Sequence, residues 1–235
     1  MTTIDHIIWA TPDLDEGIAT FRDMAGLEPA KGGSHPGLGT RNALLSLGEK
    51  IYLEILAPDP AQDLTGTYGA ALAKLAVPGV FTFSVRTDDI RQTHAKLVEL
   101  GVSTTGPIGM SRSRPDGGKL SWHIMMLNPG RFGWEFPFFI DWGNVPVHPA
   151  NDAPQGCRLR HLTVLSPNAA EIEGAFRGVG LDTSVNRAPH PGFVAALDTP
   201  RGRLVLNNAF GANDYGIVPG MLETMAQRTG FRAEV

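Results

Sequence analysis

The sequence predicts an α+β protein in which one strand–helix–hairpin unit occurs three times. Each copy begins as a short apolar strand and continues through a polar N-cap into an amphipathic helix that ends at glycine. Two further strands joined by a tight turn then complete the copy. The same order in three places, at similar spacing, indicates an internal repeat rather than chance.

The first copy shows each element clearly. Residues 5–10, DHIIWA, are apolar and rich in β-branched side chains, which is typical of a strand. In residues 11–26, Thr11 is a good N-cap, a proline follows it, and a glycine ends the predicted helix. Residues 40–48 and 50–57 look like two strands joined as a hairpin.

The two later copies keep both the order and the register. Thr82 follows His6 by 76 residues, and His161 follows Thr82 by 79. The second copy has its strand and helix at 80–101 and its hairpin strands at 118–128 and 132–139, and the third copy has these elements at 159–180, 192–198 and 203–208.

Composition argues against several classes of protein. The 235 residues include 20 Lys plus Arg and 24 Asp plus Glu, so a basic face for nucleic acid is not expected. No run approaches the ~20 apolar residues of a membrane helix, and the N-terminus lacks a signal-peptide pattern. The single cysteine excludes an internal disulfide. We therefore expect a cytoplasmic protein without nucleic-acid or membrane partners.

Polar residues gather on one face of each predicted strand. In residues 50–56, Tyr52 and Glu54 alternate with core-type residues, and Glu54 and Glu135 lie at matching positions of their copies. On a flat, wet face these would be ordinary solvated or salt-bridged residues. If the face curves into a cup, the polar residues converge, and they are His6, Asn42, Tyr52, Glu54, Thr82, Arg86, Ser121, His123 and Glu135. Two carboxylates in such a cup repel unless a cation or a proton intervenes.

The βαβββ unit resembles the vicinal oxygen chelate superfamily, which includes glyoxalases and extradiol dioxygenases. The segments GGSHPGLGTRNALLSLG (32–48) and YLEILAPDP (52–60) resemble its glyoxalase-like domain subgroup in particular. The resemblance covers most of residues 4–140 and is weaker for 158–208. It implies tandem βαβββ modules that form a curved, cup-shaped mixed sheet, with helices on the outer face.

The resemblance also implies a divalent metal in the cup. The positions that correspond to the family's ligands are His6, Glu54, Thr82 and Glu135. Thr82 departs from the pattern, because a neutral hydroxyl is a poor metal ligand. The first hypothesis is therefore a metal held by His6, Glu54 and Glu135, with Fe(II), Mn(II), Zn(II) or Mg(II) as candidates.

Two functions follow from this resemblance. The first is a metal-dependent lyase, isomerase or dioxygenase acting on a small oxygenated substrate, with Glu135 as general base and His123 as alternative base or ligand. The second is a metal-free protein that binds or sequesters a small, partly aromatic molecule in the same cup. The predicted substrate-binding residues are His35, Asn42, Tyr52, Thr82 and Arg86. A basic loop at 111–119 is either solvated or attracts an anionic substrate.

Three segments are expected along the chain. Residues 1–142 form the paired modules, residues 143–157 form a linker, and residues 158–235 form a third, partial module with a C-terminal helix. The third module has no partner within the chain, so it would leave a bare sheet edge and an open apolar surface. We therefore expect a homodimer.

Overall fold

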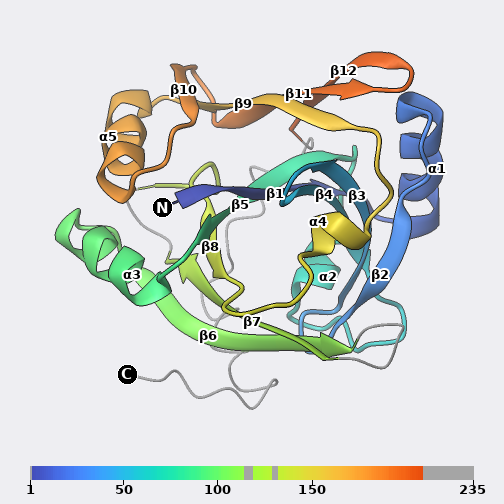
Figure 1. The fold of residues 1–235 in the computed structure, drawn as a ribbon, viewed down its shortest axis with the longest axis horizontal. Helices are drawn as coiled ribbons and strands as arrows, with labels where there is room; N and C mark the ends of the chain where they lie inside the picture. The colour runs from blue at the N-terminus through green and yellow to red at the C-terminus, as the bar shows by residue number, and fades with distance from the viewer. Residues whose placement is uncertain (1, 114–118, 129–131, 209–235) are drawn as a thin grey trace.

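The computed structural model describes residues 2–113, 119–128 and 132–208, and it shows an α+β fold with two sheets (Figure 1). The first module contains β1 (Thr2–Ala10), α1 (Leu14–Ala25), β2 (Ala30–His35), β3 (Thr40–Gly48) and β4 (Ile51–Pro58). After α2 (Tyr68–Leu72), the second contains β5 (Gly79–Thr87), α3 (Ile90–Glu99), β6 (Thr104–Ser113), β7 (Lys119–Leu127) and β8 (Phe138–Asp141). After α4 (Pro149–Asp152), the third contains β9 (Arg158–Ser166), α5 (Ala169–Val179), β10 (Ser184–Arg187), β11 (Gly192–Thr199) and β12 (Gly202–Asn207).

The first two modules share one curled sheet. Its strand order is β2-β3-β4-β1-β5-β8-β7-β6, with β1 parallel to β4 and antiparallel to β5. The two edge strands, β2 and β6, approach each other, so the sheet curls into a half-barrel with α1 and α3 outside it (Figure 1). The predicted α+β class and cup-shaped mixed sheet are confirmed.

The helices begin and end as local chemistry dictates. Asp13 caps α1, because its side chain accepts a hydrogen bond from the amide of Glu16, and it takes the role that was predicted for Thr11. Gly26 ends the helix in the left-handed conformation, with φ of 75°, which glycine adopts without strain.

The third module covers the convex side of the large sheet. Its own sheet, β10-β9-β11-β12, lies across β1 and β5 between α1 and the α3–α5 pair (Figure 1). Phe193 of β11 and Phe176 of α5 both pack against Phe83 of β5, with ring centroids 5.8 and 6.3 Å away. The apolar face that was expected to be exposed is therefore buried within the chain. The homodimer stays a prediction, but an exposed apolar face no longer supports it.

One predicted strand is wrong. Residues 132–137 form a turn, in which the amide of Phe136 donates to the carbonyl of Gly133 at 3.1 Å, and β8 begins only at Phe138. Gly133 and Pro137 explain the difference, since both residues weaken a central strand and favour turns. The alternation that placed Glu135 on the same face as Glu54 therefore does not apply.

The expected linker packs as part of the fold. It contains α4, and Ala150 and Ala153 are buried in a cluster with Leu44 and Tyr52 of the first module. The predicted C-terminal helix in residues 209–235 lies outside the described residues. No described helix is long and apolar enough to cross a membrane.

Candidate functional site

A cavity of about 410 Å³ occupies the concave side of the half-barrel. This volume lies within the range of about 300–1,000 Å³ that is typical of small-molecule sites. Most of its lining is apolar, and the aromatic residues in it are Tyr52, Tyr68, Phe81, Trp122, Phe132, Trp134, Phe136, Phe138 and Trp142.

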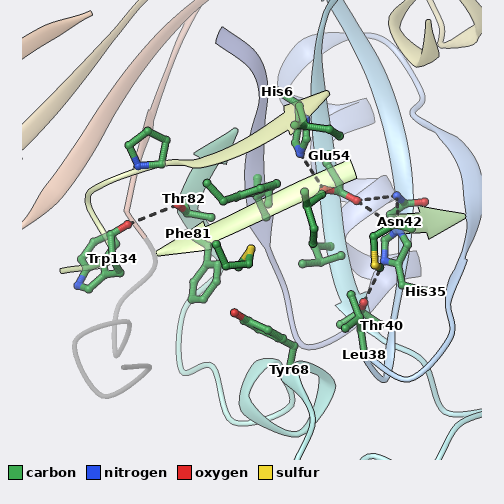
Figure 2. A pocket seen from close by; sticks show the side chains of 18 of the residues that line it. His6, His35, Leu38, Thr40, Asn42, Glu54, Tyr68, Phe81, Thr82 and Trp134 are labelled. Carbon is green, nitrogen blue, oxygen red and sulfur yellow. Dashed lines mark hydrogen bonds and ion pairs between the residues drawn. The ribbon is translucent and has the colours of Figure 1, made fainter. Parts of the chain in front are cut away.

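One corner of the cavity is polar. His6 of β1 and Glu54 of β4 face each other there, with His6 Nε2 at 3.6 Å from Glu54 Oε2 (Figure 2). Both residues are buried, and the His6 ring stacks on Tyr52 with centroids 4.5 Å apart. The parallel pairing of β1 with β4 brings the two side chains together. An imidazole and a carboxylate thus meet at the edge of an otherwise apolar space.

Asn42 fixes the other side of Glu54. Its Nδ2 donates to Glu54 Oε1 at 2.6 Å and to His35 Nε2 at 3.2 Å. The orientation of this amide follows from Gly33, whose backbone amide donates to Asn42 Oδ1 at 3.0 Å. His35 Nε2 is therefore an acceptor, so its Nδ1 carries the proton and donates to Thr40 Oγ1 at 3.0 Å.

Asp5, which the sequence interpretation missed, fixes His6. A register shift between β1 and β5 at this residue turns its carboxylate to the same side as His6. Asp5 Oδ1 accepts from His6 Nδ1 at 2.7 Å, and Oδ2 accepts from Trp142 Nε1 at 2.9 Å and His148 Nε2 at 3.0 Å. His148 can donate from Nε2 because its Nδ1 accepts the amide of Ala150.

The charge of Asp5 sets the tautomer of His6. Burial alone would raise the pKa of Asp5, but the hydrogen bonds from His148 and His6 and the charge interactions with both rings hold it well below 3.8. The ionised carboxylate keeps the proton of His6 on Nδ1. In the neutral imidazole, Nε2 is then the acceptor nitrogen, and it faces Glu54 and the cavity.

The structure places six of the predicted site residues on the cavity wall, which are His6, His35, Asn42, Tyr52, Glu54 and Thr82. It does not bring Glu135 to them. Glu135 is buried and faces the third module, where Ser166 Oγ donates to its Oε1 at 3.0 Å. Its Oε2 is buried without a hydrogen-bond partner among the described residues.

His123 and Arg86 also lie away from the cavity. On β7 the predicted faces are inverted, since Trp122, Ile124 and Met126 line the cavity while His123 is exposed on the convex side. The enclosed concave face of this strand is apolar, and the polar residues face water. Arg86 instead donates to the carbonyl of Lys50 at 2.8 Å and has Asp5 Oδ2 at 3.6 Å.

These donors do not fit the predicted metal site. His6 Nε2 and Glu54 Oε2 are close enough to share an ion at about 2.0–2.2 Å. The other two positions supply no ligand, because Glu135 faces Ser166 and the Thr82 hydroxyl donates to the carbonyl of Trp134 at 3.4 Å. In the described part of the chain, no group of three or more His, Cys, Asp or Glu residues could hold a metal ion.

We expect the protein to bind no divalent metal tightly. Two of the four predicted positions supply no ligand, and the neighbouring His35 Nε2, 3.7 Å from Glu54 Oε1, accepts a hydrogen bond from Asn42. The purified chain is incubated separately with Mn(II), Fe(II), Zn(II) and Mg(II), desalted, and analysed for metal beside His6→Ala. One equivalent of retained ion in the wild type that is lost in His6→Ala would contradict the expectation.

Comparison with known proteins places this geometry in a family. The family described as Glyoxalase-like domain matches residues 4–180. A hypothetical protein from Staphylococcus aureus is similar in structure, with a TM-score of 0.62 and 21% identity over 89% of this chain and 86% of that one. The search of curated proteins found no match.

Methylmalonyl-CoA epimerases are more distant structural neighbours. The enzyme from Mycobacterium tuberculosis has a TM-score of 0.44 and 21% identity over 61% of this chain and 88% of that one. The Streptomyces coelicolor enzyme, in complex with 2-nitronate-propionyl-CoA, has a TM-score of 0.43 and 23% identity over 60% and 97%. With the family match over residues 4–180, the resemblance seen in the sequence is confirmed, and the chain belongs to the glyoxalase-like domain family.

Proposed function

We propose that the protein is an enzyme that moves a proton on a small, mainly apolar oxygenated molecule, with His6 as the general base. The observation that carries the proposal is the line from Asp5 through His6 to Glu54. A buried carboxylate fixes the tautomer of an imidazole, and the free nitrogen of that imidazole faces a cavity. A carboxylate that orients a histidine in this way also stabilises the imidazolium that forms when the base takes a proton.

The reaction class that suits this arrangement is proton abstraction from a carbon next to a carbonyl. The proton passes from carbon to His6 Nε2, and the electron pair of the broken bond moves onto the carbonyl oxygen as an enolate. Asp5 and Glu54 flank the imidazolium, and the apolar surroundings strengthen the attraction between each carboxylate and the charged ring. Return of the proton to the same or a neighbouring atom completes an isomerase-type step. A lyase-type step follows instead if the electron pair of the enolate re-forms the carbonyl and expels a leaving group, with its bonding electrons, from the next carbon.

Metal-free binding is the second candidate, and the aromatic lining of the cavity favours it. A protein that only sequesters a ligand needs the walls but no base. The two candidates differ in one observable, which is whether the bound molecule exchanges protons.

Hydrogen exchange into an aryl methyl ketone tests the proposal. The methyl protons of 2-acetylnaphthalene in D₂O are followed by NMR with the wild type, His6→Gln and His161→Gln. We expect the wild type to accelerate exchange and His6→Gln to lose about 10²–10⁴-fold of that rate, as general bases contribute. His161→Gln is the matched control, since His161 holds the corresponding position in the third module and is exposed outside the cavity.

An unchanged rate in His6→Gln would contradict the assignment of the base. If the wild type binds the ketone but does not accelerate exchange above the rate without protein, the protein sequesters its ligand and is not an enzyme of this class.

A further inference from the structure

The charge around the cavity restricts what it can bind. Its described lining contains the carboxylate of Glu54 and no lysine or arginine, and the nearby Arg86 lies against Asp5, behind His6. A negatively charged ligand would lose its hydration here and meet the like charge of Glu54, which is costly without a paired cation. The basic loop that could attract an anion, residues 111–119, lies almost wholly outside the described side chains.

A second polar group lies away from the His6–Glu54 corner. Tyr68, the first residue of α2, directs its ring into the cavity (Figure 2). Its hydroxyl has no hydrogen-bond partner among the described residues. Burial raises the pKa of Tyr68 to about 12, so the hydroxyl keeps its proton and is a hydrogen-bond donor at neutral pH.

The position of Tyr68 is held firmly. The amide of Gly69 donates to the carbonyl of Leu38 at 3.1 Å, and the Thr67 side chain caps the helix by accepting from the amide of Ala70 at 3.4 Å. Any side chain at residue 69 would overlap the carbonyl of Gly39, so the helix lies directly on this loop. A donor fixed in this way loses little conformational entropy when a ligand binds.

The wall between the two polar groups is apolar. Tyr68 packs against a cluster that contains Ile8, Ala10, Leu56 and Phe81. Ile8 follows His6 on the same face of β1 and lines the cavity together with Leu56 and Phe81. An apolar surface thus extends from the His6–Glu54 corner toward Tyr68, and a flat aromatic molecule can cover it.

We infer that the ligand is an uncharged, flat, mainly aromatic molecule that is held at both ends. A carbonyl-bearing end lies at His6 and Glu54, and a hydrogen-bond acceptor at the opposite end binds the Tyr68 hydroxyl. The first end rests on the proposed function, whereas the second end and the absence of negative charge rest on the lining alone.

Three matched naphthalenes test this inference by calorimetric titration. They are 2,6-diacetylnaphthalene, 2-acetyl-6-ethylnaphthalene, which lacks the second acceptor, and 6-acetyl-2-naphthoate, which replaces that acceptor by a carboxylate. We expect the diacetyl compound to bind about 3–10-fold more tightly than the ethyl compound, as one added hydrogen bond implies. The naphthoate should bind at least about tenfold more weakly than the diacetyl compound because its charge is unpaired.

Tyr68→Phe provides the decisive variant. It should lower the affinity for the diacetyl compound to that for the ethyl compound and leave the latter unchanged, with an unaltered circular dichroism spectrum. Equal binding of the naphthoate, an equal effect of Tyr68→Phe on both neutral compounds, or no binding of any compound would overturn the inference. If proton exchange depends on His6 but the three compounds bind equally, the proposed function stands and the ligand class is wrong. If the compounds bind with the expected selectivity but no exchange occurs, the ligand class stands and the proposed function is wrong.

Discussion

Phe193→Ala is expected to lower the free energy of unfolding by about 3–5 kcal/mol, which is the usual cost of removing a fully buried phenylalanine. Phe193 of β11 is fully buried, and its ring contacts Phe83 and Trp134, with centroids 5.8 and 5.1 Å away. The phenylalanine thus joins the third module to β5 and to a residue that lines the cavity. Its loss should leave a cavity at this junction.

Urea unfolding followed by circular dichroism measures this effect. Val205→Ala, in β12 of the same module, is the matched control, because Val205 is 51% exposed and its truncation should change stability by less than about 0.5 kcal/mol. A loss as small for Phe193→Ala as for Val205→Ala would show that the third module does not depend on this contact. Separate transitions in the wild type would show that the modules unfold independently.

Asp5→Asn is expected to have the second large effect, on both rate and stability. The asparagine amide has no charge to hold the proton of His6 on Nδ1. Its NH₂ group also replaces one carboxylate oxygen and therefore faces another hydrogen-bond donor, either His6 or the pair Trp142 and His148. We expect the exchange rate to fall by about 10²–10⁴-fold. We also expect a loss of about 3–5 kcal/mol of stability, because a buried charged network loses its central member.

The pH dependence of stability tests whether Asp5 is ionised in the folded protein. The pKa of folded Asp5 is lowered, so its ionised form stabilises the fold above its ordinary pKa of 3.8, and this contribution is lost as the pH falls below that value. The stability difference between the wild type and Asp5→Asn should therefore be constant near neutral pH and shrink below about pH 4.

An exposed carboxylate serves as the comparison for Asp5. Asp15→Asn changes a side chain that pairs with Lys31 on the surface and should leave the exchange rate unchanged. Lys31 also lowers the pKa of Asp15, but at this exposed position the acid limb of the stability curve should change much less than in Asp5→Asn. If folded Asp5→Asn protein exchanges protons at the wild-type rate, Asp5 does not position the base.

The first module shows how far sequence alternation can reach. Its strands place core residues on one side and His6, Tyr52 and Glu54 on the other, and the structure has these three on the cavity wall. The interpretation worked here because each strand has a helix-covered face of uniformly apolar residues. The three-fold repeat was also readable, since it depends only on local strand, cap and glycine patterns.

The second module shows where the same argument fails. The alternation of polar and apolar residues indicates that the two faces of β7 differ, but it does not indicate which face lines the cavity. The cavity side of this strand is apolar because the half-barrel encloses it, so Trp122 faces inward and His123 faces water. The turn at residues 132–137 similarly removed Glu135 from the face on which a continuous strand would have placed it.

The sequence by itself determined the three strand–helix–hairpin copies, the core faces of the first module and the shared face of His6 and Glu54, because these depend on short-range periodicity. The additional strand after each helix, β2, β6 and β10, was not among the predicted elements. Only the tertiary structure decided the rest. A one-residue register shift brings Asp5 to the side of His6, the third module covers the convex face, and closure of the sheet turns β7's aromatic side inward. Each of these depends on which surface packs against which, and a strand's period of two residues cannot encode that choice.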